Sequence, residues 1–319
     1  MARRRVNMGP RRQSLAALVG VGVAASMPWW IGNYGLSFMT SLLLWIALAE
    51  SWVLLSGYAG YISLGHAAFV GMGAYVLALT WGEVPFWIGL GLGAGAGGLV
   101  ATVTGIPCLR VRGPYFVILT LSVAEFLKFA VINIEARLGS FGRLILGAPD
   151  AQTIFWLALA LAAAAFALAF YVRHSRLGVG LRAIRENEEA AEATGVPASR
   201  LKTLAYVLSA IIPAMVGGLL VARTGYFEPA SIFSAQISLT IIAMCVAGGS
   251  DDPWGPLLGV LLVTVLSELL RDRSPELYQI LLGGLLVFFV MRAPQGLLGW
   301  LRQLQLRLQR QRREREIPS

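Results

Sequence analysis

The sequence has little of the chemistry that catalysis, metal binding or nucleotide binding requires. Its 319 residues contain two histidines and two cysteines, and the cysteines, Cys108 and Cys245, lie beside or within apolar runs with no metal-ligand spacing. The lysines are Lys128 and Lys202, each preceded by leucine, so the Gly-Lys pair of a phosphate-binding P-loop is absent. We therefore predict no catalytic residue and no metal site, and any ATP hydrolysis must take place on another chain.

Charge is also scarce. Charged residues make up 13% of the chain and hydrophobic residues 57%, with a mean hydropathy of +0.69, whereas ordinary globular domains carry about 25% charged residues. One soluble core of this size cannot bury so much apolar surface. The net charge of +9 does not indicate a nucleic-acid partner, because the arginines gather at the termini and in one central loop between apolar runs. The composition predicts an all-α polytopic membrane protein embedded in the lipid bilayer.

Apolar runs long enough to cross a bilayer recur along the chain. A crossing helix needs about 20 mostly apolar residues, and the last runs are short because Gly248-Gly249 and Asp251-Asp252-Pro253 interrupt them. Residues 235–271 therefore form either two crossings or one broken helix. With two, about ten transmembrane helices are expected, some short or broken, over residues 15–32, 36–55, 62–80, 86–106, 114–134, 153–172, 201–222, 235–250, 255–271 and 276–292.

The distribution of arginine favours ten crossings with both termini in the cytoplasm. Ten spans place eighteen arginines inside and five outside, as the positive-inside rule requires, whereas nine would put the basic tail outside. A short match between residues 109–114 and 270–275 is compatible with an inverted repeat. The expected order is a basic cytoplasmic N-terminus (1–14), a six-span bundle (15–172), a cytoplasmic loop (173–200), a four-span bundle (201–292) and a basic cytoplasmic tail (293–319).

The loop 173–200 is expected to hold a short surface helix. Ala, Glu and Arg are strong helix formers, the pairs Arg182–Glu186 and Arg185–Glu189 have (i, i+4) spacing, and Gly195 suits the residue after a helix end. The charge run alone would also fit a solvated loop. As a helix, it could dock into a partner. The candidate coupling residues are Arg182, Arg185, Glu186, Glu189, Ala190, Ala191 and Gly195.

A second informative stretch, residues 57–75, reads GYAGYISLGHAAFVGMGAY. Its small residues predict a broken or a tightly packed span, and packing alone would also account for them. Ionisable residues within spans usually face a cavity or a partner, although His66 also fits a packed core residue, and Glu125 and Lys128 are (i, i+3) neighbours expected to pair with each other. The candidates for the translocation path are Glu50, Tyr58, Tyr61, Ser63, His66, Phe69 and Thr120.

These motifs resemble a known family. Glu189-Ala190-Ala191 followed by Gly195 is similar to the EAA loop of ATP-binding cassette (ABC) importer permeases, and residues 57–75 resemble the hallmark of branched-chain amino acid ABC transporter permeases of the LivM type. Further matches, in order from about residue 40 to 298, include residues 109–116, Gly248-Gly249 and residues 293–297. The chain departs from the family pattern at Val53 and in residues 138–144, an outer loop, where receptor docking or substrate range is expected to differ.

The resemblance implies a type II ABC importer-like permease that works by alternating access. The implied partners are a second permease of the LivH type, two ATP-binding subunits that hold ATP and Mg, and an extracytoplasmic substrate-binding protein, in the inner membrane of a bacterium or archaeon. This chain itself is expected to hold no cofactor. Urea, amides or aromatic acids are alternative cargoes within the family. A separate alternative is an ion-coupled secondary transporter that uses Glu50, Glu125 or His66, and an integral membrane enzyme is disfavoured by the missing chemistry described above.

Overall fold

A computed structural model describes residues 19–140, 142–271, 275–292 and 296–301. The predicted basic N-terminus (1–14) and most of the basic tail (293–319) lie outside the described residues, as does part of the second copy of the expected repeat, so these predictions remain as they were.

The described chain is built from helices that run back and forth, with one short strand pair. In order the elements are η1 (Met27–Trp29), α2 (Asn33–Trp52), the π-helical η2 (Val53–Gly57), α3 (His66–Leu79), α4 (Phe86–Cys108), α5 (Pro114–Arg137), β1 (Arg143–Leu144), α6 (Ala151–His174), α7 (Arg176–Glu186), α8 (Glu188–Ala193), α9 (Ala198–Thr224), β2 (Tyr226–Phe227), α10 (Pro229–Ile232), α11 (Ala235–Gly248), α12 (Trp254–Arg271) and α13 (Pro275–Arg292).

The helices agree with the expectation of an all-α polytopic membrane protein. Six are long and apolar enough to cross a membrane, and four shorter apolar helices, Val19–Trp29, His66–Leu79, Trp254–Leu270 and Ile280–Phe289, accompany them. Each of the ten predicted spans overlaps one of these ten helices.

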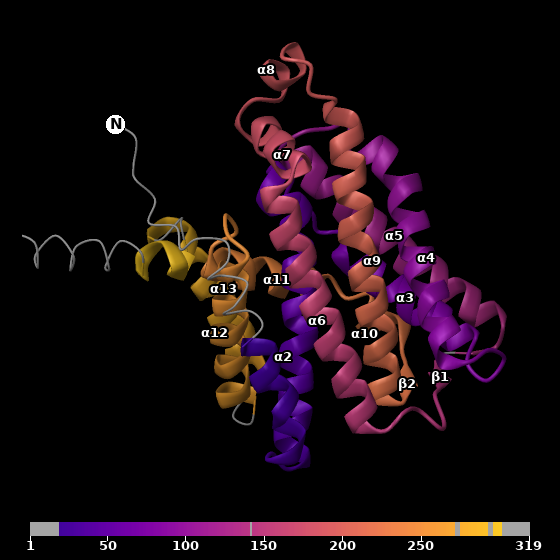
Figure 1. Ribbon diagram of the computed structural model, residues 1–319. Helices are drawn as coiled ribbons and strands as arrows, with labels where there is room; N and C mark the ends of the chain where they lie inside the picture. The colour runs from indigo at the N-terminus through magenta and orange to yellow at the C-terminus, as the bar shows by residue number, and fades with distance from the viewer. Residues whose placement is uncertain (1–18, 141, 272–274, 293–295, 302–319) are drawn as a thin grey trace, which may run out of the picture.

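The two ends of the bundle differ (Figure 1). At one end α7 and α8 project beyond the long helices, and we call this the loop end. At the other, β1 pairs antiparallel with β2, Arg143 opposite Phe227, and we call this the strand end. There the Arg143 guanidinium binds the Glu135 carboxylate, with Nη2 2.9 Å from Oε1, and so fixes β1 to the end of α5.

Residues 235–271 form two helices rather than one broken crossing. The chain turns back after α11 at Gly249, whose φ of +100° favours glycine. A Cβ on Gly248 would lie 1.9 Å from the Gly255 carbonyl oxygen, and one on Gly259 1.8 Å from that of Met244. Glycine therefore lets α11 and α12 pack backbone against backbone, and the ten-crossing expectation agrees with this reversal.

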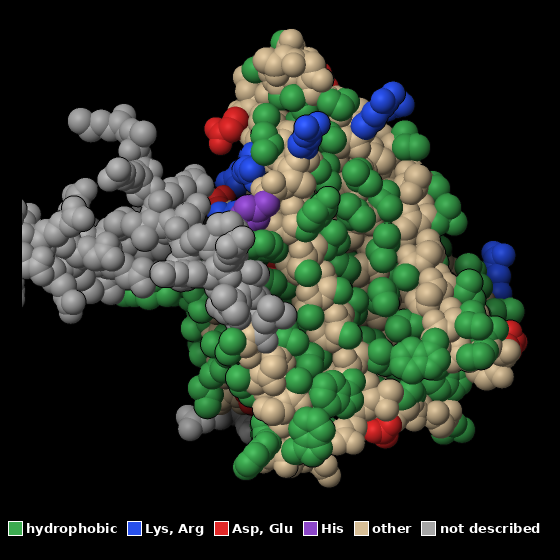
Figure 2. Space-filling view, viewed as in Figure 1, with side chains coloured by type: hydrophobic (Ala, Val, Ile, Leu, Met, Phe, Trp, Pro, Cys, Tyr) green, Lys and Arg blue, Asp and Glu red, His purple; other side chains and the backbone are tan. Residues whose placement is uncertain are grey.

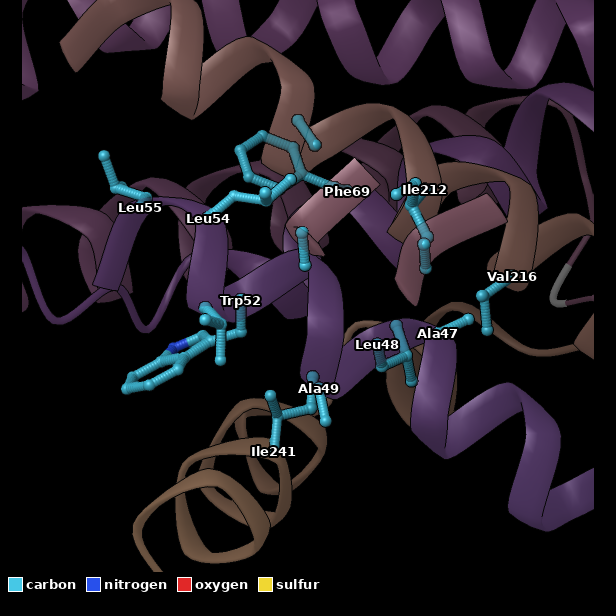
Figure 3. Close-up of a cluster of buried hydrophobic side chains, with 14 of the residues drawn as sticks. Ala47, Leu48, Ala49, Trp52, Leu54, Leu55, Phe69, Ile212, Val216 and Ile241 are labelled. Carbon is cyan, nitrogen blue, oxygen red and sulfur yellow. The ribbon is translucent and has the colours of Figure 1, made fainter. Parts of the chain in front are cut away.

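The largest core cluster is built around α2 and η2, with buried side chains from α3, α6, α9 and α11. Figure 3 shows part of it, where Leu54 of η2 lies beside Phe69 of α3 and Ala49 of α2 lies beside Ile241 of α11. Cys108 and Cys245 are buried free thiols within α4 and α11. The labelled core residues, each less than 8% exposed, are Ala47, Leu48, Ala49, Trp52, Leu54, Leu55, Phe69, Ile212, Val216 and Ile241.

The outer surface matches a lipid-embedded bundle. On the face seen in Figure 2, hydrophobic side chains spread over the long helices, and most of the visible Lys and Arg side chains lie towards the loop end. Large apolar side chains are exposed at mid-helix, among them Leu99, Phe126 and Phe129. Exposed apolar surface on this scale needs lipid or another membrane chain to cover it.

Candidate functional site: a broken span joined to the loop end

The span predicted over 62–80 is broken. Its first residues belong to a segment that is not helical, residues 60–65, and α3 begins only at His66, so 14 residues of helix complete the crossing. In a bilayer such a segment needs internal partners for its backbone groups. Side chains provide them: Trp52 Nε1 donates to the Ser63 carbonyl (3.0 Å), and the Leu64 amide donates to Thr120 Oγ1 (3.1 Å).

Ser238 of α11 completes this support. Its hydroxyl donates to the Leu64 carbonyl at 2.8 Å and accepts from the Ala67 amide at 3.0 Å. One side chain thus bridges the end of the irregular segment and the first turn of α3, where helix amides have no partner in the helix itself. The irregular segment is therefore held by α2, α5 and α11 together.

Small residues place α3 directly against α9, as the glycine content of residues 57–75 predicted. A Cβ on Gly73 would lie 1.9 Å from the Ala214 carbonyl oxygen, and one on Gly217 would lie 1.9 Å from that of Val70. Only glycine permits this approach. The sequence left open whether this span is broken or only tightly packed, and the structure shows both features.

A buried ion pair fastens the loop to this broken span. Glu188, at the start of α8, is 8% exposed; its Oε1 lies 2.6 Å from Lys202 Nζ, and its Oε2 accepts from the Tyr61 hydroxyl at 2.6 Å. Lys202 Nζ also donates to the Tyr61 hydroxyl and the Leu109 carbonyl, both at 3.0 Å. Arg112 Nε lies 3.2 Å from Glu188 Oε2 at the outer edge. We call Tyr61, Arg112, Glu188 and Lys202 the Glu188 cluster.

The electrostatics of the Glu188 cluster favour the charged carboxylate. Burial alone would raise the pKa of Glu188, but hydrogen bonds from Lys202 and Tyr61, with the charges of Lys202 and Arg112, hold it below its ordinary value. Burial and the hydrogen bond to Glu188 raise the pKa of Tyr61, so this phenol stays protonated and donates. One carboxylate therefore holds α8, α9 and the segment leading to α3.

The loop consists of two helices, not one, which corrects the sequence expectation. The backbone of Asn187 is extended (φ −160°, ψ 109°), ending α7, and its side chain caps α8 by accepting from the Ala190 amide at 3.0 Å. Because the chain turns here, Arg185 does not pair with Glu189. Arg185 Nη1 instead donates to the Gly57 carbonyl (2.8 Å) and to Asp251 Oδ1 (2.7 Å).

The other predicted coupling residues take different positions. Arg182 Nη1 donates to the Arg173 carbonyl at 2.9 Å. Glu189 is exposed, with Arg112 Nη1 3.5 Å from its Oε1. Among the remaining members of the set, Ala191 is buried whereas Glu186 and Ala190 are exposed.

The expected helix end at Gly195 is confirmed. Its φ is +90°, its amide donates to the Glu192 carbonyl (2.9 Å), and the Val196 amide donates to that of Ala191 (3.0 Å). These two bonds form a Schellman motif.

The seven predicted path residues are all buried within the chain, each 8% exposed or less. Ser63, His66 and Thr120 gather around the irregular segment and the start of α3. Tyr61 belongs to the Glu188 cluster, and the Tyr58 hydroxyl donates to the Ala169 carbonyl of α6 at 3.1 Å. Their role in the path stays a prediction.

His66, Phe69 and Glu50 complete this set. The His66 ring lies 6.0 Å from the Phe69 ring, which in turn lies 5.5 Å from Tyr206, so the imidazole is packed among aromatic groups. Neither the His66 ring nitrogens nor the Glu50 oxygens have a hydrogen-bond partner among the described residues. A buried polar group without a partner is uncommon in folded proteins, so both residues stay candidates for a role beyond packing.

Sequence reasoning missed Glu188 and gave Lys202 no structural role. Glu188 and Glu189 are adjacent acids, and only the break at Asn187 decides that the first turns inward while the second is 84% exposed. A signal existed in Lys202, since it is one of two lysines in the chain and begins an apolar span. A lysine in that position requires an acidic partner.

Comparison with known proteins agrees with this architecture. A family model described as "Branched-chain amino acid transport system / permease component" matches residues 34–290. The chain is 28% identical to the high-affinity branched-chain amino acid transport system permease protein LivM of Escherichia coli and 27% identical to that of Salmonella typhimurium, in both cases over 93% of this chain and 77% of the relative. It is also 28% identical to the L-arabinose ABC transporter permease protein AraH of Azospirillum brasilense, over 81% of this chain and 78% of that protein.

No solved structure matches the chain. The family match covers the broken span, α5, the loop and the helices from α9 into α13, and so includes every element that carries the site described above. The chain therefore belongs to the family of permease components of branched-chain amino acid transport systems.

Proposed function

We propose that the chain is one transmembrane subunit of an ABC importer that carries branched-chain or related small apolar amino acids. The two LivM relatives are named for that transport and align over more of this chain than AraH, which is named for L-arabinose. Urea, amides and aromatic acids would need the same architecture and differ only in the groups that line the path.

The proposed orientation places the loop end in the cytoplasm and the strand end outside, in the inner membrane. The excess of arginine on the loop side supports it. The strand end, with its Glu135–Arg143 pair, then faces the extracytoplasmic binding protein. The loop end faces two ATP-binding subunits, which hold the ATP and Mg, and a second permease of the LivH type completes the path.

The Glu188 cluster is the observation that carries this proposal. A displacement of α8 by an ATP-binding subunit would act on Tyr61 through a 2.6 Å hydrogen bond, and Tyr61 lies five residues before the start of α3. The irregular segment is not helical and is held by side chains of α2, α5 and α11, so we place the hinge there. Movement at the loop end would therefore change the position of the α3 start, around His66, within the membrane.

The test begins with purification of the tagged chain from its native membranes and identification of every co-purifying subunit. The complex is then placed in liposomes, and uptake of radiolabelled leucine is measured with and without ATP on the loop side. We expect a second permease and ATP-binding chains to co-purify, and uptake to depend on ATP and to persist when ionophores collapse the ion gradients. Uptake by the chain alone, driven by an ion gradient, would establish the secondary-transporter alternative instead.

A further inference from the structure

Two opposite charges lie in the middle of α5. Glu125 and Lys128 are the twelfth and fifteenth of its 24 residues, so both lie near the centre of a helix about 36 Å long. They form an ion pair with each other, and Lys128 Nζ also lies 5.2 Å from the centre of the Phe129 ring. Among the described ion pairs, this is the one whose two members belong to a single membrane-crossing helix.

This pair is accessible from outside the chain. The Glu125 side chain is 35% exposed and that of Lys128 is 19% exposed, whereas the predicted path residues are buried. Of the six long spans, α5 is the least buried within the chain: 22% of the residues in its most apolar stretch are buried. The chain therefore covers one side of α5 and leaves much of the rest open.

Charges at this depth do not face hydrocarbon. Ionisable groups inside a membrane face a water-filled cavity or another protein and mark substrate pathways. In the proposed permease pair, the open side of α5 would therefore line the water-filled path. Pairing with each other keeps both groups satisfied when the path is empty, because a lone charge there would be strongly destabilising.

The chemistry of the pair matches one class of ligand. An α-amino acid carries an ammonium and a carboxylate side by side, so the zwitterion can replace the internal pair with two charge-assisted hydrogen bonds, ammonium to Glu125 and carboxylate to Lys128. When it leaves, the pair closes again, so release strands no charge. Leu121 and Phe129, four residues before and after Glu125, lie on the same side of the helix and offer apolar surface to a branched side chain.

We propose that Glu125 and Lys128 form a binding step in the translocation path for the zwitterionic head of an amino acid. This inference rests on the proposed function and adds the contact residues to it. In this arrangement the cargo contacts the open surface of α5, whereas the side chains that hold the broken span, those of Trp52, Thr120 and Ser238, are buried.

The test uses the complete complex in liposomes with its binding protein unchanged, so that any difference comes from this chain. ATP-dependent leucine uptake is measured for Glu125→Gln, Lys128→Met and the charge-exchanged Glu125→Lys/Lys128→Glu. Each single change is expected to lower uptake roughly 10- to 100-fold, the range of one lost charge-assisted contact. The exchanged pair should assemble normally but transport no better, since a zwitterion aligned for the original pair meets both charges reversed.

An ion pair with only a structural role would form equally well with its two charges exchanged. Recovery of uptake by the exchanged variant would therefore overturn the inference. Normal uptake in both single variants would overturn it as well. Asn133→Leu is the matched control, because Asn133 is an exposed polar residue of the same helix and, among the described residues, its side chain bonds to the Phe129 carbonyl alone (2.7 Å). Uptake by this variant should be unchanged. If the unaltered complex shows no ATP-dependent leucine uptake, the proposed function itself fails and takes this inference with it.

Discussion

Replacing Glu188 by alanine should detach the loop from the membrane bundle. The change removes the 2.6 Å contact with Lys202, the 2.6 Å hydrogen bond from Tyr61 and the 3.2 Å contact with Arg112. It leaves the Lys202 ammonium, only 5% exposed, without a counter-charge. The Tyr61 hydroxyl and the Leu109 carbonyl remain as its hydrogen-bond partners.

The size of the effect follows from the burial of this pair. Removing one member of a buried ion pair costs about 3–5 kcal/mol of stability. Because Lys202 keeps two hydrogen-bond partners, the Tyr61 hydroxyl and the Leu109 carbonyl, we expect the lower value, about 3 kcal/mol. At about 1.36 kcal/mol for each factor of ten, the detached form of the loop becomes about 150-fold more populated. Coupling of ATP hydrolysis to uptake should fall with it.

Hydrogen exchange of the backbone amides in residues 188–201 measures this population in the detergent-solubilised complex. Uptake and ATP hydrolysis in liposomes provide the functional comparison. The matched control is Glu189→Ala, because Glu189 is 84% exposed and has one contact, with Arg112 at 3.5 Å. Exposed pairs contribute at most about 1 kcal/mol, so the control should exchange less than about tenfold faster.

Equal exchange rates in the Glu188→Ala and Glu189→Ala variants would refute the reasoning. A second variant, Glu188→Ala with Lys202→Met, tests its physical basis. With no buried charge left unpaired, exchange should be slower than in Glu188→Ala alone. Exchange as fast as in the single variant would mean that the stranded ammonium is not the source of the instability.

Other changes test the remaining features. The pKa of Glu188 is depressed in the folded chain, so attachment of the loop should be constant above about pH 4.3, the ordinary pKa of a glutamate. Attachment should be lost as the pH falls from there through the lower pKa of the folded state. Hydrogen exchange of the loop measured as a function of pH tests this. Gly73→Ala should lower the stability of the folded chain by about 1–3 kcal/mol, because the added Cβ would lie 1.9 Å from the Ala214 carbonyl oxygen. Gly95→Ala is the control, since its Cβ would meet open space. The melting temperature should fall only in the first variant. Gly195→Val forces φ +90° on a β-branched residue at roughly 1–2 kcal/mol and should uncouple ATP hydrolysis from uptake; normal uptake per ATP would contradict this.

The sequence alone was sufficient for the fold class and for the positions of the crossings. Apolar runs define spans because a bilayer demands about 20 apolar residues from a helix, and each of the ten runs overlaps an apolar helix. Local chemistry was equally readable where one residue decides it. Gly195 ends α8 because its φ is positive, and the (i, i+3) spacing of Glu125 and Lys128 was enough to pair them.

Tertiary structure decided which residues act together. The choice between Glu188 and Glu189 depends on one extended residue, Asn187, and on the approach of Tyr61 and Lys202, which lie 127 and 14 residues away from Glu188 in the chain. Likewise, Ser238 meets Leu64 across 174 residues. Periodicity and composition report which face of a helix is apolar. They do not indicate which distant residue packs against that face, because this depends on how the helices pack against one another.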